Sequence, residues 1–361
     1  MKYSGFTLGK LVTIKYGKNQ KKVQSDEGSI PIYGTGGLIG YATEALYDKP
    51  SVLIGRKGTI NKVQYVDHPF WTVDTLFYTE VNETVVIPKY LYYLMSLLDL
   101  DSYNEGTTIP SLRTETLNRL EFDIPCREYQ RKVLSVLDPI DNKIKLNEEI
   151  NGNLHEQAKA IFSKMIIEDA DKSWTPGVLS DIAKVTMGQS PKGDTYNEDG
   201  VGTVFFQGRA EFGFRFPARR LYTTDPKRMA QANDALLSVR APVGDMNVAY
   251  EDCCIGRGLA AISSKNGHQS FVLYTMFNLR EELNVFNGEG TVFGSINRDA
   301  LNSMPISIPP KKVQDEFEAI VAPMDAAIRN HYDEICRFAA IRDSLLPRLM
   351  SGELDVSDLD L

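Results

Sequence analysis

The sequence contains little cysteine, histidine or tryptophan for its length. Its 361 residues include four cysteines, four histidines and two tryptophans. The cysteines (Cys126, Cys253, Cys254 and Cys336) form no Cys-x-x-Cys pair, and the histidines are scattered along the chain. Because disulfide frameworks and zinc sites show characteristic ligand spacings, we expect neither here. The expected location is a reducing cytoplasm.

Long apolar runs are also missing. The longest, residues 90–98, is much shorter than the roughly 20 residues that cross a bilayer. The N-terminal MKYSGFTLGK lacks the apolar segment of a secretory signal. Hydrophobic residues make up 42% and charged residues 24% of the chain, as in globular proteins. We therefore expect no membrane partner and two or three globular domains.

Familiar catalytic and cofactor motifs are absent as well. The glycine-rich segment PIYGTGGLIGY (31–41) lacks the Lys-Ser/Thr of a P-loop, and Ile39 stands where a dinucleotide fingerprint has its third glycine. There is no Gly-x-Ser-x-Gly, no His-Glu-x-x-His and no Asn/Asp-Pro-Pro-aromatic segment. These absences favour a binding and scaffolding protein that has no catalytic residues, metal or cofactor of its own. The alternative is a stand-alone nuclease or methyltransferase whose catalytic residues are dispersed.

An internal repeat is the strongest positive feature. EGTTIPSLRTETLNRLEFDIP (105–125) returns 184 residues later as EGTVFGSINRDALNSMPISIP (289–309). The same offset carries Gln130 onto Gln314 and Asp141 onto Asp325, and it places Arg56 over Arg240. The segments TLGKLVTIKYGK (7–18) and VLSDIAKVTMGQ (178–189) are also alike. The chain is therefore a tandem duplication of a variable body followed by a shared segment, which we call the arm.

The bodies are predicted to be mixed α/β. Runs rich in β-branched and aromatic residues lie between glycine-rich turns and predict strands. The predicted strands are residues 51–54, 62–66, 75–79, 235–239, 246–250 and 259–262, and each body closes with a further strand at 120–125 or 304–309. Helices are predicted at 88–98 and 269–282. With helical arms, the expected fold class is α+β.

Each arm is predicted to be one long helix with a heptad pattern. Apolar residues recur with steps of four and three, which is typical of a coiled-coil seam. The apolar seam residues are Val133, Leu137, Ile140, Ile144, Leu154, Ile161 and Met165 in the first arm, and Phe317, Val321, Met324, Ile328, Ile335, Phe338, Leu345 and Leu349 in the second. Asn147, Asn151, His331 and Arg342 are polar seam members that can fix the register. The alternative is that each helix packs only on its own body.

Proline should interrupt both predicted helices. Pro139 and Pro323 occupy matching places in the two arms. Because proline removes a helical hydrogen bond and clashes with the preceding turn, we expect each helix to kink or restart there. The remaining length of each helix would then be roughly 40 Å.

Charge is distributed unevenly. The net charge of −8 argues against nucleic acid as a partner, but residues 1–24 contain six lysines and no acid. Residues 205–230 contain five arginines and one lysine against two acidic residues. Screening limits each charge to about 10 Å, so local patches decide what is bound. Either the two basic segments bind an anionic partner or they are solvated faces.

Further motifs accompany the two variable bodies and their similar arms. They are Tyr-Gly-Thr-Gly-Gly-x-x-Gly-Tyr at 33–41, Ile-Pro-Pro at 308–310 and LLPRLMSGELDVSDLD at 345–360. With these motifs, the pattern as a whole resembles the specificity subunit of type I restriction–modification systems. The resemblance covers essentially the whole chain. One departure is Cys126, which stands where the second copy has another proline.

The resemblance implies an architecture and a role. Target recognition domains are expected at 1–125 and 171–309, and helical arms at 126–170 and 310–361, the second arm including an acidic tail. The arms would pair as an antiparallel coiled coil, which relates the bodies by a pseudo-two-fold axis. The chain would read a bipartite, asymmetric sequence in double-stranded DNA and dock two methyltransferase subunits, to which restriction subunits attach. S-adenosylmethionine, ATP and magnesium would belong to those partners.

Residues that could contact DNA are chosen by their chemistry. Arg and Lys suit guanine, Asn and Gln suit adenine, and basic groups, hydroxyls and glycine backbone suit phosphate. The candidates are Lys18, Asn19, Gln20, Lys21, Lys22, Tyr33, Thr35, Gly36, Arg56 and Lys57 in the first body, and Gln189, Lys192, Gln207, Arg209, Arg215, Arg219, Arg220 and Arg240 in the second.

Each candidate group has a structural alternative. Lys21 and Lys22 could form a solvated turn, and the glycine-rich segment could be only a tight turn. Arg56 and Arg240 could each form a structural ion pair with an acidic residue. Thr107, Ser111 and Arg113, with Thr291, Ser295 and Asn297, lie in the repeated segment, so they are expected to serve the fold or to contact a phosphate. A coiled-coil scaffold that binds no DNA is a further alternative.

Overall fold

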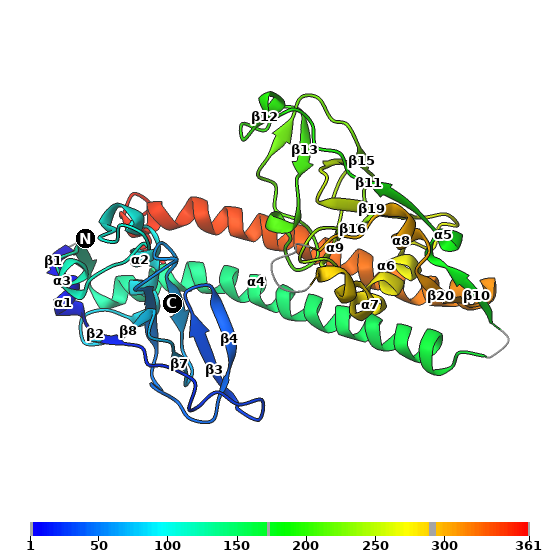
Figure 1. Ribbon diagram of the computed structural model, residues 1–361. Coiled ribbons are helices and arrows are strands. Elements are labelled where there is room, and N and C mark those ends of the chain that lie inside the picture. The colour runs from blue at the N-terminus through cyan, green and yellow to red at the C-terminus, as the bar shows by residue number, and fades with distance from the viewer. Residues whose placement is uncertain (1–2, 172–173, 289–293, 360–361) are drawn as a thin grey trace. The chain divides into compact units, whose positions relative to one another are not determined.

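The chain forms two compact units, each of which contains part of both long helices. The computed structural model describes residues 3–171, 174–288 and 294–359. Unit 1 comprises residues 1–146 and 334–361, and unit 2 comprises residues 147–333. The division falls inside α4 (Arg127–Phe162) and α9 (Lys311–Met350), which are labelled in Figure 1.

Unit 1 has a four-stranded antiparallel sheet in the order β2-β8-β5-β6. These strands are β2 (Val12–Tyr16), β5 (Ser51–Gly55), β6 (Gln64–Val66) and β8 (Leu76–Val81). A second sheet, β4-β3-β7, consists of β3 (Ile30–Gly34), β4 (Gly37–Ala42) and β7 (Trp71–Thr72), and β1 (Tyr3–Thr7) pairs with β9 (Glu121–Pro125). The helices are α1 (Leu8–Leu11), α2 (Pro88–Ser96), η1 (Leu100–Tyr103) and α3 (Thr114–Asn118).

Unit 2 repeats this plan. Its four-stranded sheet has the order β11-β19-β16-β17, a second sheet has the order β12-β14-β13-β18-β15, and β10 pairs with β20. The strands are β10 (Thr175–Val178), β11 (Ala183–Met187), β12 (Tyr196–Asn197), β13 (Thr203–Phe206), β14 (Tyr222–Thr223), β15 (Met229–Ala230), β16 (Ala235–Ser238), β17 (Met246–Val248), β18 (Cys253–Ile255), β19 (Leu259–Ser264) and β20 (Pro305–Ile308). The helices are η2 (Ser163–Glu168), α5 (Leu179–Ile182), η3 (Gly193–Thr195), η4 (Arg209–Glu211), α6 (Gln269–Asn278), α7 (Arg280–Asn284), η5 (Val285–Asn287) and α8 (Arg298–Asn302).

In each unit the body packs on the helical pair. The core of unit 1 joins Tyr90 and Leu91 of α2 to Val133 of α4 and Leu349 of α9. The core of unit 2 joins residues of α6 and the sheet to Ala158 and Phe162 of α4 and to Phe317 and Val321 of α9. Separating a body from the helices would expose these apolar residues to water, so their burial holds the body on the helical pair.

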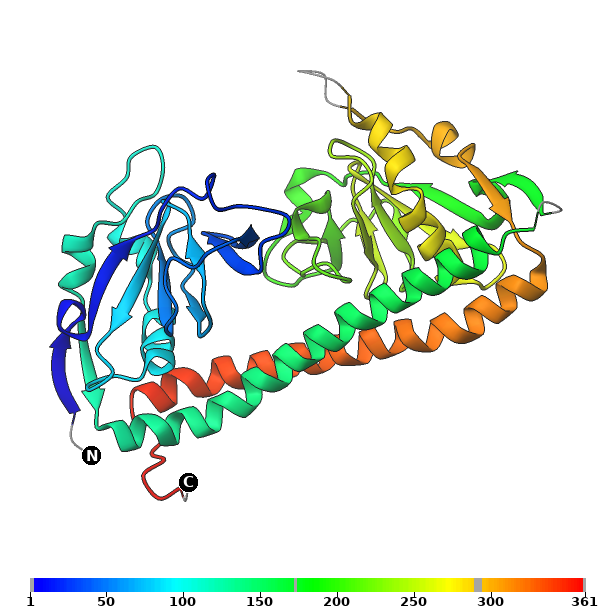
Figure 2. The same cartoon turned by 90° about the horizontal axis from the view of Figure 1, so that it is seen from below.

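The two helices run antiparallel in both units. In unit 1 Asp141 of α4 meets Arg342 of α9 at 3.3 Å, and Lys143 meets Glu334 at 3.2 Å. In unit 2 Asn151 Oδ1 lies 2.9 Å from His331 Nδ1. Every apolar residue of the predicted seam is buried or half-buried. Figures 1 and 2 both show α4 (green) and α9 (orange to red) side by side within each unit.

The α+β fold class, with two mixed α/β domains and two long helices, is therefore confirmed. The expectation that the helices restart at proline is wrong, because α4 continues through Pro139 and α9 through Pro323. Both prolines are exposed, whereas their neighbours Leu137 and Val321 are fully buried. Packing of the apolar stripe outweighs one lost helical hydrogen bond, and water can reach the carbonyl that is left over.

The offset of 184 in the arms has a structural cause. Gln130 Nε2 donates to the carbonyl of Pro125 at 2.9 Å, and Gln314 Nε2 donates to that of Pro309 at 2.8 Å. Each glutamine ties the last strand of a body to the first turn of its helix. A second repeated contact joins a tyrosine hydroxyl of the body to the aspartate of the arm, at Tyr93–Asp141 and Tyr274–Asp325.

In the described part of the chain, no helix is both long and apolar enough to cross a membrane.

Candidate nucleic-acid interface

Three loops of unit 2 meet at the end of its four-stranded sheet. Gln189 N, just after β11, donates to Ile255 O at 2.9 Å. Gly256 N donates to Phe206 O at 2.8 Å, which joins the turn after β18 to the end of β13. Arg257 N donates to Ser190 Oγ at 3.2 Å. These bonds hold together segments that are up to 67 residues apart in the sequence.

Close backbone approach makes glycine necessary in this cluster. A Cβ atom on Gly188 would lie 2.1 Å from Gly256 O, and one on Gly256 would lie 2.9 Å from Gln207 Cα. Since real Cβ atoms essentially never come that close, larger residues would push the loops apart. The loops therefore form a compact platform.

The platform carries three exposed polar side chains: Gln189, Gln207 and Arg257. The two glutamines are sequence-predicted candidates, and the structure brings them to the same end of unit 2. Arg257 was missed by sequence reasoning. The sequence feature that could have identified Arg257 is the Gly-Arg-Gly turn (256–258) between two apolar strands. Gln and Arg are the residues that make paired hydrogen bonds to adenine and guanine.

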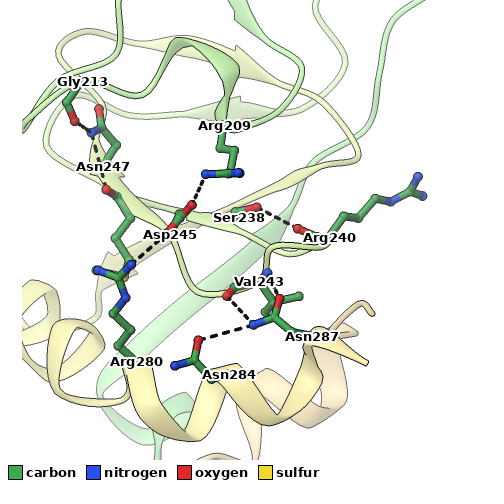
Figure 3. Close-up of polar contacts among 11 residues, drawn as sticks. Arg209, Gly213, Ser238, Arg240, Val243, Asp245, Asn247, Arg280, Asn284 and Asn287 are labelled. Carbon is green, nitrogen blue, oxygen red and sulfur yellow. Dashed lines mark hydrogen bonds and ion pairs between the residues drawn. The ribbon is translucent and has the colours of Figure 1, made fainter. Parts of the chain in front are cut away.

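Arg240 lies just after β16 and differs from the arginines near it. Arg209 and Arg280 both form ion pairs with Asp245, whereas the side chain of Arg240 points away from the other labelled residues (Figure 3). Arg240 is exposed, and its guanidinium forms no ion pair within the residues that the structure describes. Its backbone is fixed, because its carbonyl accepts from Ser238 Oγ at 3.0 Å.

Unit 1 forms a corresponding platform from β2, β3 and β7. Lys18 N donates to Thr72 O at 2.9 Å, and Val73 N donates to Tyr33 O at 3.1 Å. Trp71 Nε1 donates to Lys18 O at 2.9 Å. These bonds bring residues 18–22 close to the start of the glycine-rich turn, so the candidates of the two segments lie together.

The glycine-rich turn joins β3 to β4. Lys62 Nζ donates to Gly36 O at 2.9 Å, and the Tyr33 hydroxyl lies 3.2 Å from His68 Nε2. Thr35 is half-buried and Gly36 is exposed. Lys62 is a cation at this site that sequence reasoning missed, and no periodic pattern marks it.

The run after β2 is an exposed turn. Lys18, Asn19, Lys21 and Lys22 are exposed, Gln20 is half-buried, and Lys21 N is held by Asn19 Oδ1 at 2.9 Å. None of these lysines has an ion pair within residues 3–171, 174–288 and 294–359. A turn whose cations are not neutralised by the protein can bind an anion, so the prediction stands beside its solvated alternative.

The repeat offset does not hold inside the bodies, and this changes one prediction. Arg56 N donates to Thr75 O, and the equivalent bond runs from Val239 N to Gly258 O. Bridges join Lys57 to Ser111 and Arg240 to Ser295. By these contacts, Arg240 of unit 2 is equivalent to Lys57 of unit 1, and Val239 is equivalent to Arg56.

Arg56 and Lys57 have different surroundings. Arg56 donates to the Asp74 carbonyl at 3.0 Å and stacks on Tyr16 with 5.1 Å to the ring centroid. Lys57 is exposed and has no ion pair in the described residues. Arg56 thus has local structural contacts, whereas Lys57 and Arg240 are matched, exposed cations.

The basic segment of unit 2 is largely neutralised by the protein itself. Arg219 pairs with Glu251 at 2.5 Å. Arg220 pairs with Glu211 at 2.5 Å and with Glu198 at 3.0 Å, and these carboxylates raise the pKa of its guanidinium. Lys192 is exposed at the turn before η3. The Arg219–Glu251 and Arg220–Glu198 pairs are exposed and contribute little to stability, so they remain able to exchange partners, whereas the Glu211 side chain is mostly buried.

Arg215 is a correction. Its side chain is only 5% exposed and donates to Asp325 Oδ1 at 2.7 Å and to the Tyr274 hydroxyl at 2.9 Å. A buried arginine that is held by the arm aspartate has no face left for a duplex. We therefore remove Arg215 from the candidates, while the other predictions stay predictions.

The repeated segment serves the fold. Ser111 and Ser295 bridge to the loops that carry Lys57 and Arg240, and Asn297 caps α8 through Ala300 N at 2.9 Å. Arg113 pairs with Glu105 at 3.1 Å. Thr291 lies outside the described residues. Among the residues described, no three His, Cys, Asp or Glu side chains cluster as metal ligands do.

Comparison with known proteins shows the family of the chain. Residues 2–156 and 171–335 match the model of the type I restriction modification DNA specificity domain. The chain is 30% identical over 300 residues to the putative type I restriction enzyme MjaX specificity subunit of Methanocaldococcus jannaschii, covering 76% of this chain and 70% of that protein. It is 23% identical over 349 residues to the MjaIX specificity subunit of the same organism, covering 87% and 80%.

A solved structure has the same fold. The S subunit of a type I restriction-modification system from M. genitalium aligns with a TM-score of 0.61 at 15% identity, covering 97% of this chain and 96% of that one.

Proposed function

Since the chain belongs to the type I restriction–modification DNA specificity family, we propose that it reads a two-part, asymmetric DNA target for a type I complex. In this proposal each body reads one half of the target. The paired helices set the gap between the halves and dock the partner subunits.

The observation that carries the proposal is a scaffold built twice with different exposed residues. Both units have the same strand order in their main sheet and the same bonds between loops at its end. The side chains presented there differ, as Lys18 and Gln189 do. A common frame with unlike readers suits a target whose halves differ in sequence.

The helices support the scaffolding part of the proposal. Both arms keep the same contacts to their bodies, through Gln130 and Gln314 and through Asp141 and Asp325. Two matching arms would offer two equivalent docking sites, one for each of two methyltransferase subunits. Restriction subunits would join through that complex.

Catalysis, in this proposal, lies outside this chain. S-adenosylmethionine, ATP and magnesium would be used by the methyltransferase and restriction subunits. The complex would act in the cytoplasm, where its DNA substrate is found.

Methylation mapping tests the proposal directly. The chain is expressed with its methyltransferase partner in cells that lack other adenine methyltransferases, and modified adenines are located by sequencing. We expect a single split motif with a fixed gap. Methylation without such a motif, or a motif that persists when this chain is deleted, would contradict the proposal.

The enzyme alternative has its own test. The purified chain is incubated with DNA, magnesium, ATP and S-adenosylmethionine but no partner. We expect neither cleavage nor methyl transfer, and either activity would favour a stand-alone enzyme.

A further inference from the structure

We propose that matched positions on the two platforms choose the bases, and that one cation at an equivalent position in each unit holds a DNA phosphate. The inference rests on the proposed DNA-reading function and assigns it to residues. The base-choosing residues are Lys18 and Asp74 in unit 1 and Gln189, Gln207 and Arg257 in unit 2. The shared cation is Lys57 in unit 1 and Arg240 in unit 2.

Matched hydrogen bonds establish which positions correspond. Gly17 N donates to Leu76 O and Gly188 N to Leu259 O, both at 2.9 Å, so Lys18 and Gln189 follow equivalent glycines. Lys18 N then donates to Thr72 O and Gln189 N to Ile255 O, again both at 2.9 Å. Counting on from Thr72 and Ile255 makes Asp74 equivalent to Arg257.

The parallel strand pairs establish the third position. Tyr33 is opposite Thr72 in the β3–β7 pair, and Phe206 is opposite Ile255 in the β13–β18 pair. The next residues, Gly34 and Gln207, are therefore equivalent. The five side chains at these positions, Lys18, Asp74, Gln189, Gln207 and Arg257, are exposed, whereas Gly34 is buried at the end of β3.

The chemistry at these positions differs between the units in every case. The equivalent residues of units 1 and 2 are lysine and glutamine, glycine and glutamine, and aspartate and arginine. Since glycine has no side chain, the second position reads a base in unit 2 only. Each type prefers a different base edge, since arginine and lysine suit guanine, glutamine suits adenine and aspartate accepts from cytosine. Positions that only serve the scaffold are instead kept, as at Gly17 and Gly188 and at Ser111 and Ser295.

The cation position behaves in the opposite way. Lys57 and Arg240 are both exposed, both are bridged through the backbone to the serine of the repeated segment, and both keep a positive charge. Arg209 and Arg219, by contrast, are paired with carboxylates. What two unlike half-sites have in common is the phosphate backbone, so a cation kept at equal places is expected to bind phosphate.

The test uses the complex of this chain with its methyltransferase partner and a library of duplexes of random sequence. Bound duplexes are selected and sequenced for the wild type and for Arg257→Ala and Arg240→Ala. Lys184→Ala is the control, because Lys184 is an exposed cation near the other end of β11.

Arg257→Ala should reduce discrimination at one position of one half-site by about 10- to 100-fold and leave the other half unchanged. Arg240→Ala should keep the sequence preference but weaken binding to all duplexes, and the slope of log affinity against log salt should become shallower by about one. Lys57→Ala should behave like Arg240→Ala. Lys184→Ala should change neither quantity.

Failures of the two proposals can be told apart. If the wild-type complex selects no sequence, the DNA-reading function itself fails. If the wild type selects a split motif but Arg257→Ala keeps every base preference, or Arg240→Ala alters one, the residue assignment is wrong. Arg257→Gln is a second variant in case the alanine variant does not fold. It should move the preferred base from guanine towards adenine, and an unchanged base would also overturn the assignment.

Discussion

At the scale of single residues, neighbouring arginines of unit 2 have different tasks. Arg215 is buried against Asp325, whereas Arg219 pairs with Glu251 at the exposed surface. Removing one partner of a buried pair leaves an uncompensated charge, while exposed pairs contribute little. Replacing each of these two arginines in turn therefore compares the contribution of a buried ion pair to stability with that of an exposed one.

Arg215→Ala should lower the free energy of unfolding by about 3 kcal/mol, because Asp325 loses its charged partner in a largely buried site. Arg219→Ala should cost less than about 1 kcal/mol. Urea unfolding followed by circular dichroism measures both. An equal, small effect of the two changes would show that the buried pair is not structural.

His155 of α4 gives unit 2 a pH dependence. Desolvation among the rings of Phe214, Tyr274 and Phe277 lowers its pKa to about 4, and Arg215 and Lys159 act in the same direction while Glu156 opposes them. The unfolded chain takes up this proton near pH 6.5, but the folded chain does so only near pH 4. Stability from this group is therefore complete above pH 6.5 and is lost as the pH falls towards 4.

His155→Gln should weaken that dependence. Relative to the wild type, the variant should lose less stability between pH 7 and pH 5, by on the order of 1 kcal/mol once solvent screening is allowed for. Thermal unfolding at the two pH values measures the difference. Identical losses in both proteins would mean that His155 is not the titrating group.

The base-choosing residues show what local sequence signals could not supply. Gln189, Gln207 and Arg257 come from three segments that meet only through backbone bonds, and no periodicity connects them. Sequence chemistry found the two glutamines but also chose Arg215, because burial of a single arginine leaves no mark in the pattern around it. The constant offset matched Arg240 to Arg56 for a similar reason, since loops of unequal length shift the register inside the bodies.

At the scale of elements, the helices could be predicted best. A seven-residue period is a local property, so the seam residues could be found without knowing the fold. The effect of Pro139 could not, because it depends on which side of the helix faces solvent. Strand segments such as β5 were found from their composition, whereas the very short strands β7, β12 and β14 carry too few residues to form a pattern.

The polar pair in the unit 2 seam should stabilise helix pairing. Asn151 is 3% exposed and its amide oxygen lies 2.9 Å from His331 Nδ1. Each of Asn151→Ala and His331→Ala should destabilise the protein by about 1–2 kcal/mol, because each leaves a polar atom of the partner without its hydrogen bond. Together they should cost less than the sum.

A double-mutant cycle measures the coupling, which we expect to be about 0.5–2 kcal/mol. The exposed α9 variant Lys312→Ala, combined with Asn151→Ala, serves as the additive control. Strict additivity for Asn151 and His331 would show that the two side chains do not cooperate.

At the scale of the whole molecule, both long helices are shared between the units. In the proposed function, the length of these helices therefore sets the gap between the two halves of the DNA target. Seven residues that continue the heptad can be inserted after Leu146 in α4 and after Asp333 in α9, where the compact units divide. Each helix then gains about 10 Å, or about three base pairs of duplex. The seam keeps its register because a whole heptad is added.

Methylation mapping of this variant should give the same two half-sites with a gap about three base pairs longer. An insertion in only one helix should abolish methylation, since the seam is then out of register. An unchanged gap in the double insertion would show that the helices do not set the spacing.

The ends of the chain belong to the same unit, because residues 334–361 complete the unit that residues 1–146 begin. Leu346, Leu349 and Val356 are buried in its core. A stop codon late in the gene would therefore damage the module that was translated first, while the module encoded in the middle would keep all its parts. For this protein, the position of a truncation along the gene does not indicate which half of the recognition machinery is lost.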